Sequence, residues 1–349
     1  MKILFYLHHP AHFHLFKHSI RKLIALKHDI RIVATKKDVL EDLIKTEGWE
    51  YENFLPHGRK DNKFSIAFGL IKQDLRLLRK CLKDRPDLLI GTSTEICHIG
   101  YLLRIPNIFV NEDDADIIPL VKKLAHPFAM HLLSPDVCET GEPHKTITYR
   151  GYHELAYLHP NVFSADKNIV RKYFNPDEKY FILRFAKLKA HHDSGVQGID
   201  TETASRLIEM MSKHGKVFIT AERELEKEFE PYRLNIKPID MHHVMAFASL
   251  YIGDSQTMAA EAGVLGIPFI RYNDFVGRIG YLKDIEENYG LGFGIKPGNQ
   301  EILLGKVNEL LNTKDIKTLW EAKRKKMLGD KIDVSDFFVN LFLSINKYS

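Results

Sequence analysis

Residues suited to binding an anion gather in one segment, Asp254-Ser255-Gln256-Thr257-Met258, which Glu261 follows. The apolar run Leu250–Gly253 before it predicts a buried strand, and the segment predicts a helix capped by Asp254 or Ser255. Backbone N–H groups in a helix's first turn lack intrahelical acceptors, so they suit a phosphate or diphosphate. Glu261 lies nearly two turns along, where it could accept hydrogen bonds from ribose hydroxyls. The alternative is a capped helix that binds nothing, which leaves a glutamate among small apolar residues unexplained.

Further candidates follow predicted strands in the C-terminal half of the chain. Arg184 ends one strand, where its guanidinium could clamp a diphosphate through two N–H groups. His192 and Asp193 lie in the loop after that strand, Glu222 follows the next strand, and His242 opens the helix before Ser255. Each of these could be structural alone. Their shared position at strand ends is what indicates a binding site.

The N-terminal half offers acid–base chemistry. Five of the 18 histidines lie within residues 8–18, and His12 stands where a predicted strand gives way to a helix. An imidazole there can act as a general base or bind a phosphate, or it can simply hydrogen-bond the loop. Glu112 and Asp113 follow the fifth predicted strand and could accept a proton or sugar hydroxyls. Acidic residues at a helix start are the alternative.

Several classes of site are not expected. His14 and His18 share a helical spacing but have no local carboxylate or cysteine partner, so we predict no metal site. The glycines of a dinucleotide fingerprint and the phosphate-binding G-x-x-x-x-G-K-[ST] motif are both missing, so we expect no cofactor. The formal net charge of +4 is too small to indicate nucleic-acid binding.

Two domains of the same architecture must position these residues. Short apolar runs alternate with helical patterns from end to end, which is typical of parallel sheets covered by helices on both faces. The pattern restarts after about residue 150. We therefore expect an α/β protein with two doubly wound, Rossmann-like domains facing a central cleft. Their bounds would be 1–151 and 152–330, and the C-terminal helix in 331–349 would pack back toward the first domain.

Charge and hydropathy bear on location. The longest stretch free of Asp, Glu, Lys and Arg, Ile3–Phe16, has 14 residues, and the next, Met241–Gly253, has 13; both are too short to span a bilayer. The N-terminus lacks a signal-peptide core, and the three cysteines predict reduced thiols, so we expect a cytoplasmic protein. The basic, amphipathic helix Ser65–Leu82 is typical of a solvated face, with peripheral association at the inner membrane face as the alternative.

The Asp254–Glu261 segment resembles the nucleotide-binding motif of GT-B glycosyltransferases and of non-hydrolysing UDP-N-acetylglucosamine 2-epimerases. In those families an Asp-Ser opens the helix that holds the diphosphate, and a glutamate six residues after the serine holds the ribose. The first loop, residues 8–14, is similar to that of the peptidoglycan N-acetylglucosaminyltransferase, with His12 in the histidine's place and the glycines missing.

Almost the whole chain resembles a bacterial and archaeal family of unknown function that is grouped with GT-B proteins. The sequences that carry this resemblance are His9-Pro-Ala-His-Phe-His14, Gly151-Tyr-His-Glu-Leu-Ala-Tyr-Leu-His-Pro160, Leu183-Arg-Phe185, His192-Asp193 and Asp254-Ser-Gln-Thr-Met258. Because the family has no assigned reaction, the resemblance implies the fold directly and the chemistry by analogy.

The resemblance implies a metal-independent hexosyltransferase of cell-surface polysaccharide synthesis. It would move a sugar from a nucleotide diphosphate sugar, UDP-linked, to a glycan or lipid-linked acceptor. His12 would deprotonate the acceptor, with Glu112 as the second choice, and Arg184 would neutralise the leaving group. An epimerase or hydrolase is the alternative, although Thr92 stands where the epimerases have an aspartate. A nucleotide-sugar binding protein without catalysis is a third hypothesis.

Overall fold

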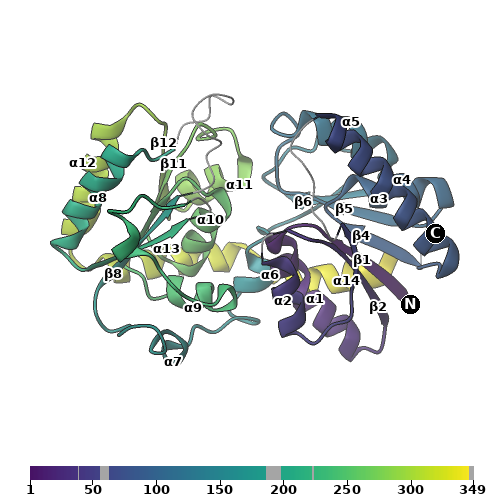
Figure 1. Cartoon of the computed structure of the whole chain (residues 1–349), viewed down its shortest axis with the longest axis horizontal. Helices are drawn as coiled ribbons and strands as arrows, with labels where there is room; N and C mark the ends of the chain where they lie inside the picture. Colours follow the sequence, from purple (N-terminus) through teal and green to yellow (C-terminus); the bar gives the residue numbers. More distant parts are fainter. Residues whose placement is uncertain (38, 56–62, 186–197, 222–223, 346–349) are drawn as a thin grey trace. The chain divides into compact units, whose positions relative to one another are not determined.

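The chain forms two compact units in a computed structural model that describes residues 1–37, 39–55, 63–185, 198–221 and 224–345 (Figure 1). Unit 1 comprises residues 1–162 and 332–349, and unit 2 comprises residues 163–331. Each unit is built on its own parallel sheet. No helix within the described ranges is both long enough and apolar enough to cross a membrane.

Unit 1 carries a seven-stranded sheet in the order β3-β2-β1-β4-β5-β6-β7. The apolar runs at residues 3–7, 30–35, 51–55, 88–91, 108–111 and 131–134 predict six strands in this half. All six are present, and β7 adds an edge strand that the sequence pattern does not indicate. The strands are β1 (Lys2–Leu7), β2 (Asp29–Thr35), β3 (Glu52–Leu55), β4 (Leu88–Gly91), β5 (Asn107–Val110), β6 (His131–Pro135) and β7 (Thr146–Tyr149).

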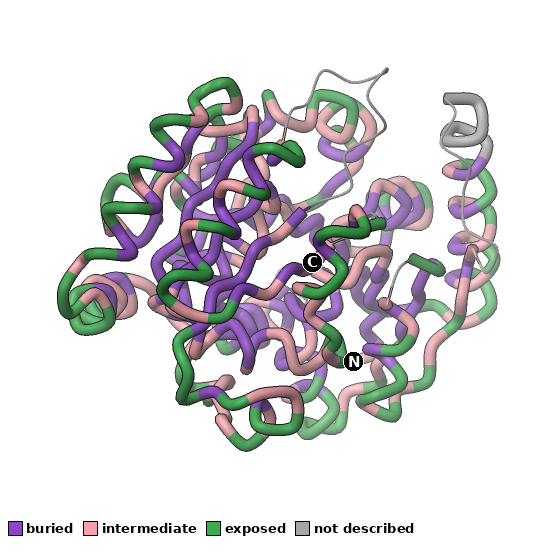
Figure 2. The backbone as a smooth tube through the Cα atoms, turned by 60° about the vertical axis from the view of Figure 1, so that its left-hand side comes forward, coloured by how far each residue is buried: buried purple, intermediate pink, exposed green. Residues whose placement is uncertain are grey.

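The central strands of unit 1 are continuous apolar runs because helices cover both faces of the sheet. All residues of β4 and β5 are buried, and Figure 2 shows buried strands beneath helices whose outer surfaces are exposed. The covering helices are α1 (Pro10–Ala25), α2 (Leu40–Thr46), α3 (Lys63–Lys83), α4 (Thr94–Leu103), α5 (Pro119–Ala125), the 3₁₀ turn η1 (His126–Phe128), α6 (Leu155–Leu158) and α14 (Val334–Ile345).

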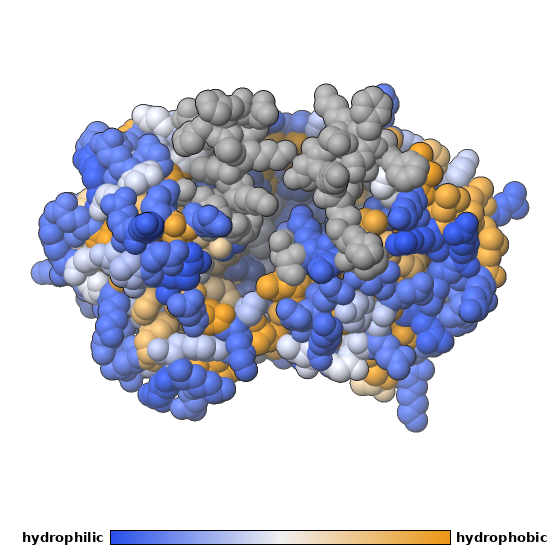
Figure 3. Space-filling view, viewed as in Figure 1, coloured by the Kyte–Doolittle hydropathy of each residue, from blue (hydrophilic) through white to orange (hydrophobic). Residues whose placement is uncertain are grey.

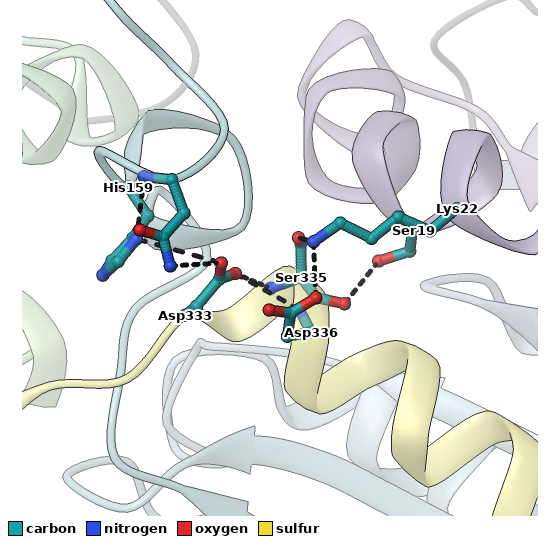
Figure 4. Close-up of polar contacts among 7 residues, drawn as sticks. Ser19, Lys22, His159, Asp333, Ser335 and Asp336 are labelled. Carbon is teal, nitrogen blue, oxygen red and sulfur yellow. Dashed lines mark hydrogen bonds and ion pairs between the residues drawn. The ribbon is translucent and has the colours of Figure 1, made fainter.

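The last helix, α14, belongs to unit 1 because its N-terminus and its aromatic face are both held there. Asp333 accepts hydrogen bonds from the backbone N–H groups of Ser335 and Asp336 at 3.0 and 3.2 Å, which caps the helix. Lys22 of α1 reaches the Asp336 carboxylate at 2.7 Å (Figure 4). Phe338 and Phe342 are fully buried, and Phe342 lies edge-on to Phe5 of β1.

The sequence boundary drawn at residue 151 lies before the end of unit 1. Helix α6 packs against α1, and His14 of α1 stacks on Tyr157 of α6 with ring centroids 5.5 Å apart. Unit 1 therefore retains the chain as far as Val162.

Unit 2 carries a five-stranded parallel sheet in the order β12-β11-β10-β8-β9. Its strands are β8 (Tyr180–Phe185), β9 (Lys216–Ala221), β10 (Leu250–Gly253), β11 (Phe269–Tyr272) and β12 (Gly292–Ile295). Its helical segments are α7 (Lys167–Val170), α8 (Thr201–Ser212), η2 (Glu230–Tyr232), η3 (Pro238–Asp240), α9 (Met241–Met245), α10 (Gln256–Leu265), α11 (Gly280–Lys283), η4 (Asp284–Asn288), α12 (Gln300–Asn312) and α13 (Ile316–Asp330).

Two local expectations for unit 2 were wrong. The sequence pattern of Leu234–Pro238 predicts a strand after β9. This strand does not form: only a single bridge joins Arg233 to Ile219, and the 3₁₀ turn η3 begins at Pro238. The glycine-rich stretch 290–294, expected to be a turn, turns only at Gly290, whose φ is +59°, and then becomes β12. Gly292 lies where an added Cβ would be 2.3 Å from the Phe269 ring, so the strand requires glycine there.

Candidate functional site

The sheet of unit 2 has a topological switch point between β8 and β10, where successive connections leave in opposite directions. Arg184 of β8 pairs in register with Gly253 at the end of β10. A Cβ on Gly253 would lie 2.7 Å from Cβ of Arg184 and 2.6 Å from the Tyr251 hydroxyl oxygen. Glycine therefore lets the two strands approach, which sets the Arg184 backbone directly beside the start of α10.

Helix α10 opens at this edge with Ser255 as its N-cap. The Ser255 hydroxyl accepts a hydrogen bond from the Met258 N–H at 3.4 Å, and no acidic residue occupies the first turn. The helix begins at Gln256, one residue after the cap. The N–H groups of its first turn and the positive end of the helix dipole suit an anion.

Glu261 and His242 form a buried pair that joins α10 to α9. His242 Nε2 lies 2.9 Å from Glu261 Oε1, and both side chains are 7% exposed. The two residues came from separate parts of the sequence argument, and the fold places them in contact. The imidazole fixes one oxygen of the carboxylate that the resemblance assigns to the ribose.

The buried Tyr251 hydroxyl is influenced by several charged groups at this edge of the sheet. Burial raises the pKa of its hydroxyl well above the usual value; Arg184 opposes that rise, whereas Asp254 and Glu261 increase it. One guanidinium and two carboxylates therefore act electrostatically on the same buried phenol. Asp254 is itself buried, at 8% exposure.

A buried network that the sequence argument did not identify supports the loop before α10. The Asn273 side-chain amide donates to the Asp254 carbonyl at 3.0 Å. Arg271, which is fully buried, donates to Asn273 and holds Glu286 through two N–H groups at 2.9 and 3.1 Å. Asn273 follows β11 directly, so a search of every strand end in this sheet would have found it.

Three predicted residues of unit 2, His192, Asp193 and Glu222, lie outside the described residues.

The sheet of unit 1 has its own switch point, between β1 and β4. His12 in the first turn of α1 and Thr92 after β4 meet there, and the hydroxyl oxygen of Thr92 lies 2.8 Å from Nε2 of His12. Burial lowers the pKa of His12 well below its usual value, and the neighbouring His8 and His9 lower it further. The ring is therefore neutral at neutral pH and able to accept a proton.

Glu112 follows β5 at the same sheet edge and pairs with a histidine from the chain after β7. His153 Nδ1 lies 3.2 Å from Glu112 Oε2, and the two side chains are 12% and 16% exposed. Burial lowers the pKa of His153 to about 3, with Asp113 opposing that shift, so the imidazole beside the carboxylate is neutral. In the sequence, His153 stands out only as part of the family motif Gly151–Pro160, because no local pattern links it to Glu112.

Within the residues that the structure describes, no group of three or more His, Cys, Asp or Glu side chains is placed to hold a metal ion.

The comparisons with known proteins add a family and a fold. Residues 1–278 match the family described as "Protein of unknown function (DUF354)". No curated protein matches the chain.

Similar solved structures include two UDP-GlcNAc 2-epimerases. The enzyme from Methanocaldococcus jannaschii, in complex with UDP-GlcNAc and UDP, is 16% identical with a TM-score of 0.68, covering 90% of this chain and 94% of its own. The Neisseria meningitidis enzyme, bound to UDP-GlcNAc, is 12% identical with a TM-score of 0.69, covering 99% and 100%. The glycotransferase of kitacinnamycin is 12% identical with a TM-score of 0.58, covering 97% and 98%.

At these identities the likeness shows the fold, and it confirms the predicted GT-B class with its two Rossmann-like sheets. The family match covers most of the chain and confirms the resemblance drawn from its motifs. The chain belongs to the DUF354 family, and its fold is that of the GT-B enzymes.

Proposed function

We propose that this chain binds a nucleotide diphosphate sugar at the β8/β10 edge of unit 2 and transfers the sugar to a glycan or lipid-linked acceptor in cell-surface polysaccharide synthesis. The observation that carries the proposal is the Ser255-capped N-terminus of α10 beside Arg184 at the switch point. Two of the solved structures of similar fold are bound to UDP-GlcNAc, one of them also to UDP, which favours a UDP-linked donor.

In this proposal the diphosphate lies against the first turn of α10. The N–H groups of Gln256 and Thr257 hold its oxygens, whereas Met258 donates its N–H to the Ser255 cap. The side chain of Arg184 neutralises the charge that grows on the leaving group. Because these groups supply the positive charge, the transfer needs no metal. Glu261, oriented by His242, accepts hydrogen bonds from the ribose.

His12 is the proposed base for the acceptor hydroxyl. Its position in the first turn of α1, where Thr92 and the His8 N–H orient the ring, supports this role. The lowered pKa leaves the ring unprotonated at neutral pH but also makes it a weaker base than a free imidazole. Glu112 is a weaker candidate alone, since His153 engages its carboxylate.

A second candidate is a nucleotide-sugar epimerase or hydrolase. Two of the solved structures of similar fold are UDP-GlcNAc 2-epimerases. The resemblance to that family implies a glutamate after the fifth strand, which would fall near Asn111 or Glu112, directly after β5. Thr92 after β4, in place of their aspartate, argues against it. Binding of the nucleotide sugar without turnover is the third possibility.

The donor site is tested by the thermal unfolding midpoint of the full chain with UDP, UDP-GlcNAc, UDP-glucose and other nucleotides. A ligand at one hundred times its Kd adds about 2.7 kcal/mol to the free energy of unfolding. We expect a UDP compound to raise the midpoint and Ser255→Asp to abolish that rise, because aspartate keeps the cap but places a negative charge against the diphosphate.

Ser205→Asp is the matched control, because it adds the same charge at an exposed position of α8 in the same unit. It should leave the nucleotide effect unchanged. If no nucleotide shifts the midpoint, or Ser255→Asp responds like the control, the donor site is wrong.

Transfer and epimerisation are separated by incubating the chain with UDP-GlcNAc in deuterated water. Deuterium entering the sugar without any acceptor supports the epimerase. Sugar transferred from a UDP-sugar to a glycan or lipid-linked acceptor, without that exchange, supports the transferase. Nucleotide binding with neither product across a broad acceptor panel supports the non-catalytic alternative.

A further inference from the structure

Exposed hydrophobic side chains concentrate on one surface of unit 1. Of the eleven large hydrophobic side chains exposed in the described residues, seven lie on or next to helices α3, α4 and α5, where Figure 3 shows hydrophobic side chains near its right-hand edge. We call this surface the α3–α5 face. The seven are Ile71, Leu75 and Leu82 of α3, Tyr101 and Leu102 of α4, Leu120 of α5, and Met130 after η1.

The three helices form one continuous surface. Asp74 of α3 lies 3.0 Å from His98 Nδ1 on α4, and Nε2 of the same ring lies 2.9 Å from the Leu124 carbonyl on α5. The Tyr101 ring packs edge-on against Phe128 with centroids 5.4 Å apart. The exposed apolar residues are therefore held on a fixed platform, with up to 66% of a side chain in solvent, as for Tyr101.

Exposed basic side chains accompany these apolar residues on the same helices, whereas the acidic side chains of these helices are paired or buried. The residues of α3 described with side chains, together with α4 and α5, contain two acidic side chains, Asp74 and Glu95. Asp74 is paired with His98, and Glu95 is buried, at 6% exposure. The exposed cations are Lys72, Arg79 and Lys83 of α3, Arg104 after α4, and Lys123 of α5.

Large exposed apolar groups ringed by lysine and arginine suit an interface between water and anionic lipid. A second copy of the chain packed on the same face would bring like charges together, which costs free energy. A bilayer with anionic headgroups meets both the apolar and the cationic part of the face.

We infer that the α3–α5 face docks on the surface of an anionic phospholipid bilayer. The exposed apolar side chains enter the headgroup boundary, and the lysines and arginines contact lipid phosphates. The sequence had offered α3 alone, with a solvated face as the favoured explanation; the structure adds α4 and α5 and the exposure of their apolar residues. The inference does not rest on the proposed function, although it would bring unit 1 to where a lipid-linked acceptor lies.

The test is co-sedimentation of the full chain with vesicles of phosphatidylcholine alone and with phosphatidylglycerol added. We expect binding to require phosphatidylglycerol and to weaken as salt rises. Lys72→Ala with Arg79→Ala should weaken it roughly fivefold for each charge removed. Tyr101→Ser with Leu102→Ser should also weaken it, by about tenfold or more, since both side chains leave the bilayer boundary.

The control is Ile302→Ser with Leu319→Ser, which removes two exposed apolar side chains of unit 2 at 61% and 48% exposure. It should leave vesicle binding unchanged. Thermal unfolding of every variant confirms that each is folded. The inference is overturned if the chain binds no vesicle, if the control weakens binding as much as Tyr101→Ser with Leu102→Ser, or if light scattering shows a dimer that those two changes dissociate while vesicles have no effect. Nucleotide-dependent stabilisation is measured separately, so the proposed donor site can fail while this inference stands.

Discussion

The two units use one architectural rule for different chemistry. Each sheet reverses its winding at a switch point, and each places a ten-residue helix, α4 or α10, directly after a strand at that point. The unit 1 edge carries imidazoles and carboxylates. The unit 2 edge carries a guanidinium, a hydroxyl cap and the N–H groups of α10. Topology therefore selects where side chains converge, and the loop residues decide which chemical groups each edge presents.

Burial also acts differently on the two edges. In unit 1 it lowers the pKa of His12, and it lowers that of His153 to about 3, so both rings are neutral at physiological pH. In unit 2 the buried charges are retained because they are paired, as in Arg271 with Glu286. The unit 1 edge therefore carries neutral imidazoles, whereas unit 2 holds paired, buried charges.

The largest expected effect separates turnover from donor binding. His12→Ala should lower turnover in the proposed transfer by roughly 10²- to 10⁴-fold, since a positioned general base contributes about that much. It should leave nucleotide-dependent stabilisation intact, because the residue belongs to unit 1. Steady-state kinetics and nucleotide-dependent thermal unfolding measure the two quantities on the same preparation.

His9→Ser is the control in the same loop. His9 caps α1 by accepting the Ala11 N–H at 3.2 Å, and serine can replace that cap. The substitution therefore removes an imidazole with little expected effect on turnover. Equal losses for His9→Ser and His12→Ala, or full turnover by His12→Ala, would contradict the assignment of His12 as base.

Sequence patterns predict the strands of the two sheets better than they predict the contacts at the sheet edges. Apolar runs indicated β1 to β6 because central parallel strands are buried on both faces and need no partner to be recognised. The four-residue strand β7 is half polar, with only Tyr149 buried, so it lacks that signal. Leu234–Pro238 had the signal and did not form a strand, since Pro238 opens a 3₁₀ turn and cannot donate to a ladder.

The candidate site residues also fall into two groups: those that a local sequence pattern locates and those that only the fold brings together. Ser255 and Arg184 were found because strand ends can be located along the chain. The contact of His153 with Glu112, and that of Asn273 with the Asp254 carbonyl, join residues distant in sequence that only the folded chain brings together. Pairing of this kind depends on strand order, which local patterns do not encode.

The next largest effect concerns acid stability. Burial lowers the pKa of His18 and of His153 to about 3, against 6.5 when unfolded. Below pH 6.5 the unfolded chain then binds more protons than the folded one, so their contribution is complete above pH 6.5 and is lost as the pH falls toward 3. At pH 5 each of the two rings should lower the free energy of unfolding of unit 1 by about 2 kcal/mol relative to pH 7, because protonating a buried imidazole is unfavourable.

Each unit contains one tryptophan, Trp49 in unit 1 and Trp320 in unit 2, which allows the two to be followed separately. Denaturant unfolding of Trp320→Phe and Trp49→Phe at pH 7 and pH 5 should show a larger loss of stability at the Trp49 probe. His18→Gln with His153→Gln should reduce that loss. This pair isolates the histidines from the buried carboxyls Glu95 and Asp113, whose pKa values burial raises and whose effect is opposite in sign. Equal losses at both probes would remove the electrostatic contrast between the units.

The smallest effect compares the ends of the two equivalent helices. Both α4 and α10 end in a left-handed residue, which is Arg104 with φ +52° in unit 1 and Gly266 with φ +80° in unit 2. Only glycine adopts this conformation without a steric penalty. Gly266→Ala should therefore destabilise unit 2 by about 1 kcal/mol or more, because its Cβ would also lie 2.7 Å from Cδ of Arg324.

Arg104→Gly is the reciprocal change in unit 1. It relieves the left-handed strain but adds freedom to the unfolded chain, so we expect a gain below about 1 kcal/mol, visible at the Trp49 probe alone. Destabilisation by Arg104→Gly would mean that the freedom added to the unfolded chain outweighs the strain, because glycine keeps the backbone carbonyl to which Arg85 donates. Opposite signs for the two substitutions would show that the helix after each switch-point strand obeys the same backbone constraint, whatever chemistry its N-terminus carries.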